Sequence, residues 1–374
     1  MRREQFDTPF LIITGTLVLF GFFIFASASL GFLVRQEGLF SAVFINQLVS
    51  LGIGIVALLV ATRIRPPVWN KYAFYIFLVS IIATLLVFIP FLGSEFGGAR
   101  RWLSFGFLSF QPSELLKFGF IVYYAAWCAG VRGKIQTMRY GVGPLVIFLA
   151  IVGSILALQP DFGTLIIIGI GAMSIFVASG AAWKHIVLLV VTGLGSIILL
   201  GLFVPYVHNR LLTFVDPARD PLGSGYQIQQ SLIAIGSGGI TGRGFGQSVQ
   251  KFNFLPEPIG DSIFAVFAEE WGFIGSVLLI ILFIAFLARG YRIANKAPTG
   301  FTRLLVIGFI TTIVAQSFIN IGAMLGILPL TGDPLVFVSH GGSSLLITLI
   351  EIGIILRIST YSVSKNTLKG GSRT

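Results

Sequence analysis

Long apolar runs separated by short polar stretches follow one another along the whole chain. A membrane-spanning helix needs about 20 predominantly apolar residues, because hydrocarbon cannot satisfy backbone hydrogen bonds outside a helix. Runs of roughly this length fall at residues 8–30, 40–61, 71–92, 115–130, 142–158, 162–179, 184–204, 262–288, 303–327 and 343–361. The pattern therefore predicts an all-α polytopic integral membrane protein with about ten transmembrane helices.

The polar stretches between these runs are unevenly charged. Most of the 25 Lys and Arg residues fall on the side that carries both termini, whereas most of the acids fall on the other side. Cytoplasmic loops are enriched in Lys and Arg, so both termini are expected to be cytoplasmic. The formal net charge of +11 is then mainly a sign of topology, and no nucleic-acid partner is expected.

The composition agrees with a membrane protein. Hydrophobic residues make up 55% of the 374 residues and charged residues only 10%, too few to cover a soluble protein of this size. The one cysteine, Cys128, has no intramolecular partner, so no disulfide framework is expected. Arg2 and Arg3 precede an apolar run as in a signal peptide, but that run is longer than the usual h-region of about 7–15 residues.

The longest polar segment spans residues 205–261, between the seventh and eighth runs. We expect it to form a large extracytoplasmic loop within a single transmembrane domain that covers residues 1–374. Loops of this length in compact proteins are usually functional or disordered. The two halves of the chain show neither a duplication nor paired broken helices, which are features of many transporters.

Ionisable residues occur beside several predicted spans, where they are costly and mark candidate functional sites. Glu114 and Lys117 are three positions apart at the start of the fourth span, so they share a helix face and can form an ion pair. Asp161 follows Gln159 and Pro160, where proline breaks the helix and the aspartate can cap the next one. A structural ion pair and a helix cap would also explain these residues.

Residues 236–246 are rich in glycine and precede Lys251, with Arg243 among them. Backbone amides and cations in such a run could approach a phosphate. The run matches neither the P-loop nor the dinucleotide-binding pattern, so a flexible loop explains it equally well.

Asp261 opens the eighth span and is followed by Glu269 and Glu270. Its position suits an N-cap, where the helix dipole favours the ionised carboxylate. It also suits a general base, which has to be ionised and partly shielded from water. At 3.6 residues per turn, only Glu269 could share the helix face of Asp261.

Several other chemistries lack the residues they need. The three histidines are scattered without the spacing of a zinc site, and the chain has neither a Gly-x-Ser-x-Gly turn nor a Cys/His arrangement for acyl transfer. The sequence therefore supports acid–base and phosphate chemistry on the outer face of the membrane.

A set of motifs in order along the chain resembles the SEDS family, the shape, elongation, division and sporulation proteins. The motifs are residues 98–114 (Gly-Ala-Arg-Arg-Trp to Gln-Pro-Ser-Glu), 159–164 (Gln-Pro-Asp-Phe-Gly-Thr), 225–227 (Gly-Tyr-Gln), 255–257 (Leu-Pro-Glu) with Asp261 and 268–270 (Ala-Glu-Glu), 326–332 (Gly-Ile-Leu-Pro-Leu-Thr-Gly) and 339–344 (Ser-His-Gly-Gly-Ser-Ser). Within the family, the second and fifth motifs and the short tails are more similar to the elongation members, RodA, than to the division members, FtsW. The chain departs from the family pattern at Ser262, Trp271 and His340.

The resemblance implies a peptidoglycan glycosyltransferase of the bacterial cytoplasmic membrane. Such an enzyme polymerises lipid II into glycan strands on the outer face, here in cell elongation and rod-shape maintenance. Its expected partners are a class B penicillin-binding protein, which crosslinks the product, and other membrane proteins of the elongation complex. No cofactor is firmly expected, although a divalent cation, Mg²⁺ or Mn²⁺, could assist.

The family's essential acidic residue falls on Asp261, whose carboxylate would take the proton from the acceptor sugar hydroxyl. Residues 339–344 are expected to form a tight turn that seats the last span. The resemblance implies further site residues. The leaving pyrophosphate would be stabilised by cations, for which the candidates are Arg101, Arg210, Arg243 and Lys251. The prenyl chain or a sugar could pack on Trp102, which could instead anchor at the interface. A central polar cavity would be lined by Glu114, Lys117 and Asp161, and the Leu-Pro-Glu motif adds the carboxylate of Glu257.

Two functions from other classes compete with the polymerase. A lipid II flippase or similar transporter would also use a membrane cavity, but here the polar motifs crowd the outer side and no repeat is visible. A membrane scaffold would explain the family resemblance but not an aspartate at the junction between loop and span.

Overall fold

The computed structural model describes residues 5–33, 37–96, 99–105 and 108–370, which include every candidate site residue. The apolar runs form helices, whose bounds are α1 Thr8–Ser29, α2 Glu37–Arg63, α3 Pro66–Leu85, α4 Pro112–Val131, α5 Gly143–Leu158, α6 Phe162–Ala178, α7 Trp183–Phe203, α10 Ile263–Asn295, α11 Gly300–Met324 and α12 Gly342–Gly370. In the described part of the chain, nine helical stretches are long and apolar enough to cross a membrane, and α6 is shorter, with 17 residues. The predicted helical, polytopic fold is confirmed, and the protein is a multi-pass membrane protein.

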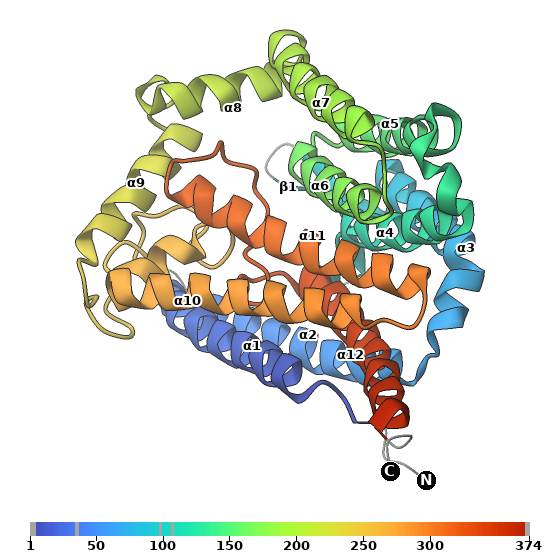
Figure 1. Cartoon of the computed structure of the whole chain (residues 1–374). Helices are drawn as coiled ribbons and strands as arrows, with labels where there is room; N and C mark the ends of the chain where they lie inside the picture. The colour runs from blue at the N-terminus through green and yellow to red at the C-terminus, as the bar shows by residue number, and fades with distance from the viewer. Residues whose placement is uncertain (1–4, 34–36, 97–98, 106–107, 371–374) are drawn as a thin grey trace.

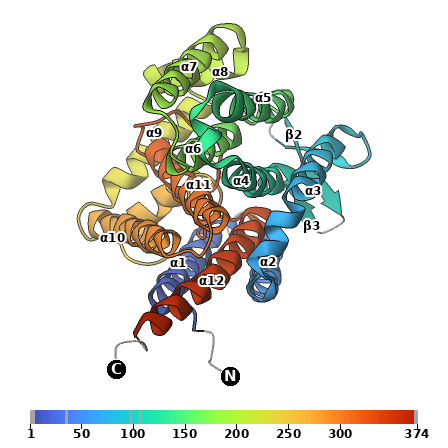
Figure 2. The same ribbon diagram turned by 45° about the vertical axis from the view of Figure 1, so that its right-hand side comes forward.

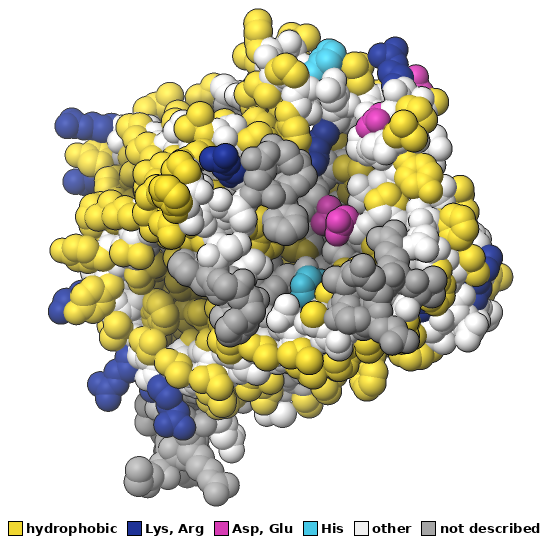
Figure 3. Space-filling model, turned by 180° about the vertical axis from the view of Figure 1, so that it is seen from behind, with side chains coloured by type: hydrophobic (Ala, Val, Ile, Leu, Met, Phe, Trp, Pro, Cys, Tyr) yellow, Lys and Arg dark blue, Asp and Glu magenta, His cyan; other side chains and the backbone are white. Residues whose placement is uncertain are grey.

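The start of α1 and the last turns of α12 lie together at one end of the helix bundle (Figures 1 and 2). With α6 counted as a tenth span the number is even, which places both of these ends on one side of the membrane. Figure 3 shows a flank covered largely by hydrophobic side chains, with Lys and Arg side chains gathered along its left edge. That edge corresponds to the end of the bundle that carries the termini, as the positive-inside rule predicts for the cytoplasmic side.

Local sequence signals set where several helices begin. Pro66 and Pro112 occupy the first helical position of α3 and α4, where the missing N–H costs nothing. Asp161 accepts a hydrogen bond from the backbone N–H of Thr164 (3.4 Å) and caps α6, as predicted. Thr299 and Thr302 form a capping box at the start of α11.

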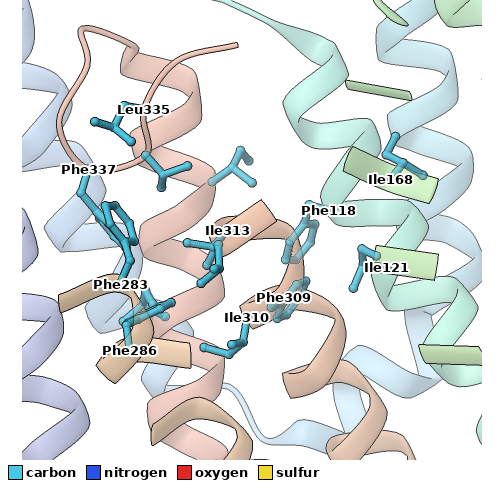
Figure 4. Close-up of a cluster of buried hydrophobic side chains, with 14 of the residues drawn as sticks. Phe118, Ile121, Ile168, Phe283, Phe286, Phe309, Ile310, Ile313, Leu335 and Phe337 are labelled. Carbon is cyan, nitrogen blue, oxygen red and sulfur yellow. The ribbon is translucent and has the colours of Figure 1, made fainter. Parts of the chain in front are cut away.

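Helix α11 lies at the centre of the bundle and packs against α4, α6 and α10. Its Phe309 ring stacks on Phe118 of α4, with 5.4 Å between ring centroids, and Ile310 and Ile313 lie nearby in the same cluster (Figure 4). By contrast, α7 exposes most of its side chains, as expected for a helix that faces lipid. The central position of α11 matters for the site, because its outer half carries polar side chains.

A small antiparallel sheet, which the sequence pattern did not predict, lies between α3 and α4. Its strands are β1 Gly93–Phe96, β2 Ala99–Phe105 and β3 Leu108–Phe110, in the order β1-β2-β3. Ser94 pairs with Trp102, and Leu103 pairs with Phe110. The sheet fixes the position of β2, which carries Arg101.

Residues 205–261 follow α7 and contain two amphipathic helices. Pro205 starts α8 (Pro205–Val215), the short helix η5 (Pro217–Arg219) follows, and α9 spans Ser224–Ser237. Helix α8 packs beside α7, and α9 packs along α10 (Figure 1). The remaining residues fold as successive turns that return to the start of α10.

Candidate active site

Asp261 lies at the end of these turns, two residues before α10 begins. The N-cap of α10 is Ser262, so the alternative that Asp261 caps the helix is wrong. The backbone carbonyl of Asp261 accepts a hydrogen bond from Asn320 Nδ2 of α11 (2.8 Å), and the same amide donates to the carbonyl of Asp333 (2.9 Å). Asn320 is buried and thus joins the two loops that carry Asp261 and Asp333.

The Asp261 carboxylate and the Arg210 guanidinium converge beside Gly332. A Cβ added at Gly332, which has φ +79°, would lie 3.6 Å from Asp261 Oδ2 and 3.7 Å from an Arg210 nitrogen. The guanidinium of Arg210 also donates to the carbonyl of Leu330 and lies 4.7 Å from the centroid of the Tyr206 ring. Arg210 therefore joins α8 to the loop that precedes α12, next to the candidate base.

The surroundings of Asp261 make its carboxyl group harder to ionise. Burial raises its pKa to about 6, and the exposed carboxylate of Glu257 adds to this effect. Arg210 and Arg101 act in the opposite direction. The side chain still keeps partial contact with solvent, so it is accessible while most of its surroundings are protein. A carboxylate of this kind is suited to general-base chemistry near neutral pH.

Arg101 approaches the same region from the sheet. Its guanidinium donates to the carbonyls of Gln159 and Pro160 and to the hydroxyl of Tyr206 (3.2 Å). Burial lowers its pKa, but the attraction of Asp161, Tyr206 and Asp333 outweighs burial, so the pKa is raised overall. Arg101 thus contacts the Tyr206 hydroxyl, Arg210 lies over the ring of the same tyrosine, and both provide positive charge close to Asp261.

Asp161 and Asp333 form a buried carboxyl pair at the start of α6. Asp333 Oδ2 lies against Gly163, only two residues after Asp161, and neither Asp161 Oδ2 nor Asp333 Oδ2 has a hydrogen-bond donor. Burial and the nearby Asp161 raise the pKa of Asp333 to about 8, against the opposing effects of a hydrogen bond from Thr331 and of the Lys117 charge. The Asp333 carboxyl group is therefore harder to ionise than that of Asp261.

Glu114 and Lys117 form the predicted ion pair, with 2.7 Å between Nζ and Oε2. Both side chains are buried, and Lys117 also donates to Gln316 Oε1 of α11 (2.6 Å). Gln316 in turn donates to the carbonyl of Pro334 (3.1 Å), in the loop that carries Asp333. The pair thus belongs to a packed polar cluster that reaches the site.

Lys251 does not lie where it could bind a pyrophosphate, so this part of the sequence prediction is wrong for the structure. Its Nζ is buried and forms an ion pair with Glu270 Oε1 (2.7 Å). Ser27 of α1 donates to the same carboxylate. Lys251 therefore holds the loop to α10 and α1, because a buried ammonium needs a charged partner.

The glycine-rich run and Arg243 are also placed away from Asp261. Arg243 lies 3.5 Å from Glu269, which accepts hydrogen bonds from Ser248 Oγ and from the amides of Val249 and Gln250. The run packs on α10, and a Cβ at its second glycine, position 238, would lie 2.1 Å from the Ala268 carbonyl oxygen. Close approach of two backbones explains the glycines, and Glu269 does not act beside Asp261.

Trp102 and Glu257 lie at the edge of the site. Trp102 is half-buried in β2, next to Arg101. Glu257 is exposed, and its carbonyl accepts hydrogen bonds from the amides of Gly260 and Ser262, which shapes the turn before α10.

The part of the chain that the structure describes contains no group of three or more His, Cys, Asp or Glu side chains that could hold a metal ion.

Comparison with known proteins identifies the family. A profile described as "Cell cycle protein", of the FtsW, RodA and SpoVE proteins, matches residues 8–364. The chain belongs to this family. It is 39% identical over 359 residues to the "Probable peptidoglycan glycosyltransferase FtsW" of Coxiella burnetii, covering 95% of this chain and 96% of the relative. It is also 39% identical to "Stage V sporulation protein E" of Bacillus subtilis, covering 96% and 99% of the two chains.

Two solved structures share the fold of the SEDS chain. One comes from a study of a peptidoglycan synthase complex that coordinates polymerization and crosslinking, with a TM-score of 0.77, 28% identity and coverage of 95% of this chain and 98% of that one. The other is the rod shape determining protein RodA of Thermus thermophilus, with a TM-score of 0.70, 27% identity and coverage of 95% and 97%. The likeness extends over nearly the whole bundle.

Two departures from the family pattern support the loop of Asp261. Ser262 Oγ accepts a hydrogen bond from Gln227 Nε2 of α9 (3.0 Å). The backbone N–H of His340 donates to the Ile259 carbonyl (2.7 Å), and its ring contacts Gln47 Oε1 (3.1 Å). Burial lowers the pKa of His340, which favours the neutral ring. The third departure, Trp271, packs edge-on against Phe20 of α1.

Sequence reasoning missed several residues of the site. Glu351 is a buried carboxylate within α12 that interacts electrostatically with Lys117, and its place in an apolar span was a usable signal. Asp333 is one of the acids that the sequence assigns to the outer side, and its local sequence did not single it out. Asn320 and Gln316 gave no signal, because uncharged polar residues are common in spans that pack against other helices.

Proposed function

We propose that the protein is a peptidoglycan glycosyltransferase that polymerises lipid II on the outer face of the cytoplasmic membrane. The observation that carries the proposal is the partly exposed Asp261 carboxylate, with a raised pKa, beside Arg210 and near Arg101. A base next to positive charge is what a sugar transfer with a pyrophosphate leaving group requires. The names of the relatives support the same activity.

In the proposed reaction, the ionised Asp261 carboxylate accepts the proton of the acceptor sugar hydroxyl as that oxygen attacks the anomeric carbon of the donor. The new glycosidic C–O bond forms while the bond from the anomeric carbon to the pyrophosphate oxygen breaks. Undecaprenyl pyrophosphate leaves with the bonding electron pair. Arg210 and Arg101 would stabilise the negative charge that develops on it, through charge-assisted hydrogen bonds.

The partner in this proposal is a class B penicillin-binding protein, which would crosslink the new glycan. The structural relative from a synthase complex that coordinates polymerization and crosslinking supports such a partner. Other membrane proteins of the elongation complex are further partners in this proposal.

The cellular role that we propose is elongation and rod-shape maintenance. The Gln-Pro-Asp-Phe-Gly-Thr and Leu-Pro-Leu-Thr-Gly motifs, and the structural likeness to RodA, support it. The alternative is a division role, which the FtsW names of several relatives favour. Depletion of the protein in its own cells separates the two, because loss of elongation gives round cells and loss of division gives filaments.

The activity is tested with purified protein in liposomes, with labelled lipid II, alone and with a class B partner. Wild type should form polymer, and Asp261→Asn should lose it while its thermal unfolding midpoint and partner binding are retained. Asp216→Asn is the matched control, since Asp216 is an exposed carboxylate paired with Arg219 and should keep full activity. Parallel assays with Mg²⁺, Mn²⁺ and EDTA test the need for a divalent cation.

Two results would overturn the proposal. Polymerisation by Asp261→Asn at the wild-type rate would remove Asp261 from the role of base. Transfer of labelled lipid II across the bilayer without polymer, in every preparation, would instead establish the flippase function.

A further inference from the structure

A pocket opens at the cytoplasmic ends of the helices, opposite the candidate active site. It has a volume of about 600 Å³ and lies where α3 and α11 begin and where α4 ends, beside Tyr361 of α12. Arg65 and Arg132 line it, and among the residues that the structure describes no acidic side chain does. The proposed polymerisation on the outer side makes no use of this pocket.

The charge of the pocket is not balanced by neighbouring carboxylates. Within the described part of the chain, neither Arg65 nor Arg132 forms an ion pair, and both side chains are exposed. Asp7 is the one described acid on the cytoplasmic side, and Arg289 binds it through two hydrogen bonds of 2.8 and 2.9 Å. The N-termini of α3 and α11, which are the positive ends of the helix dipoles, also attract an anion. The C-terminus of α4, the negative end of its dipole, opposes this effect but is one end against two.

A second, apolar groove continues from this pocket along α3 and α4. It has a volume of about 470 Å³ and shares Asn70, Ala126 and Gly130 with the basic pocket. Aromatic side chains form much of its wall, namely Phe74, Tyr123, Trp127 and Tyr140. A charged pocket that joins an apolar groove on the lipid-facing side matches a molecule with an anionic head and a hydrocarbon chain.

The rim of the groove disfavours a ligand with a cationic headgroup. Lys71 lines the groove, and the charged groups of Lys134 and Arg139 lie 5.3 and 5.7 Å from the centroid of the Tyr140 ring. Lys134 and Arg139 thus already cover the Tyr140 ring, and their charge repels a choline headgroup. Basic pockets between helices at the cytoplasmic surface are suited to anionic lipid headgroups.

We propose that the cytoplasmic ends of α3, α4 and α11 form a binding site for an anionic phospholipid of the inner leaflet. Its phosphate lies between Arg65 and Arg132, and one acyl chain lies in the groove between α3 and α4. The occupant is a phospholipid rather than a soluble anion, because the pocket continues into an apolar groove of similar size.

Binding is measured by native mass spectrometry of the full-length protein, titrated with phosphatidylglycerol or with phosphatidylcholine that has the same acyl chains. Phosphatidylglycerol should bind at least tenfold more tightly. The double variant Arg65→Ala/Arg132→Gly should lose this preference. Arg132 has φ +30°, which favours glycine, so that substitution removes the charge without harming the fold.

The control variant is Arg63→Ala/Arg303→Ala, which removes two exposed cytoplasmic arginines that do not line the pocket. It should bind like wild type. Ala126→Trp, which fills the junction of pocket and groove, should weaken phosphatidylglycerol binding while the thermal unfolding midpoint is retained.

Equal binding of the two lipids, or an unchanged preference in the Arg65→Ala/Arg132→Gly variant, would overturn the proposal. Displacement of the lipid by inorganic phosphate at micromolar concentration would show a soluble-anion site, and displacement by a polyprenyl phosphate at equal concentration would show a site for that lipid. Either result would also refute a phospholipid site.

Discussion

At the residue scale, the chemistry of the site depends on where individual carboxyl groups are ionised. Asp261 is close to two arginines, and burial raises its pKa to about 6. Asp333 is buried beside Asp161, and both effects raise its pKa further, to about 8. Two aspartates joined through one Asn320 side chain thus differ in how strongly their surroundings oppose ionisation. Asp261, which is easier to ionise, is better suited to accept a proton.

The proposed base predicts a pH dependence of the reaction. The folded-state pKa of Asp261 is raised from its ordinary value of 3.8 to about 6, and only the ionised form can accept a proton. The polymerisation rate should therefore be constant well above pH 6 and should fall about tenfold for each pH unit below it. Initial rates between pH 5 and 8, with lipid II binding measured at each pH, check this. A rate that stays level from pH 8 down to pH 5 would contradict it.

Because Lys251 and Glu270 form a buried ion pair, we expect removal of Lys251 to lower the stability of the protein without a specific loss of catalytic activity. Lys251→Met leaves the Glu270 carboxylate buried without its cation, which should cost about 3–5 kcal/mol. Thermal unfolding should show a lower midpoint, and Lys251→Met/Glu270→Gln should recover much of it. The exposed Lys184→Met serves as the control. A stable Lys251→Met protein with no activity would show instead that Lys251 contacts the substrate.

At the element scale, backbone contacts between α10 and the loop before it position the site. The long helix α10 contains one non-helical residue, Gly272, with φ +65° and ψ −164°. The glycine-rich run docks at this break, where the amide of Phe273 donates to the Gly239 carbonyl (2.9 Å). The loop therefore reaches Asp261 from a fixed anchor on α10.

Because this anchor depends on close backbone contact at Gly272, we expect a single added methyl group there to destabilise the protein strongly. A Cβ at Gly272 would lie 2.3 Å from the amide nitrogen of Gly242, so Gly272→Ala cannot be accommodated without moving backbone. We expect a loss of stability of about 2 kcal/mol or more, with reduced activity. Gly169→Ala in α6 is the matched control, because its added Cβ meets nothing within 4 Å. Equal thermal midpoints for the two variants would contradict the role of the break.

At the scale of the whole molecule, the arrangement of helices separates the candidate active site from the basic pocket. The site lies where α10 begins and α11 ends, and the pocket lies where α11 begins. Both therefore involve α11, the central helix, at its two ends. The Lys and Arg distribution assigns the site to the outer side and the pocket to the cytoplasm.

This topology predicts which positions an impermeant thiol reagent can label. Cys128 is buried, so the native chain should react little in intact cells. Leu222→Cys, at a position where the side chain is 94% exposed before α9, should be labelled in intact cells. Lys296→Cys, at an exposed position between α10 and α11, should be labelled only after the cells are permeabilised. The reverse pattern would contradict the proposed orientation.

The sequence by itself determined the spans, their orientation and the local contacts. Apolar runs have to be helical because lipid offers backbone groups no other partner, and Glu114 with Lys117 or Asp161 with Thr164 are within one helical turn. The small sheet gave no signal, since its strands of four, seven and three residues are too short to show an alternating pattern.

Only the tertiary structure decided which distant polar groups meet. Asn320 contacts Asp261 across 59 positions of sequence, and Lys117 contacts Gln316 across 199. The same packing removed Lys251 from the site and brought Asp333 beside Asp161. Such contacts depend on how helices pack against one another, and a buried polar group takes whichever partner that packing provides, because leaving it unpaired costs more than any local preference supplies.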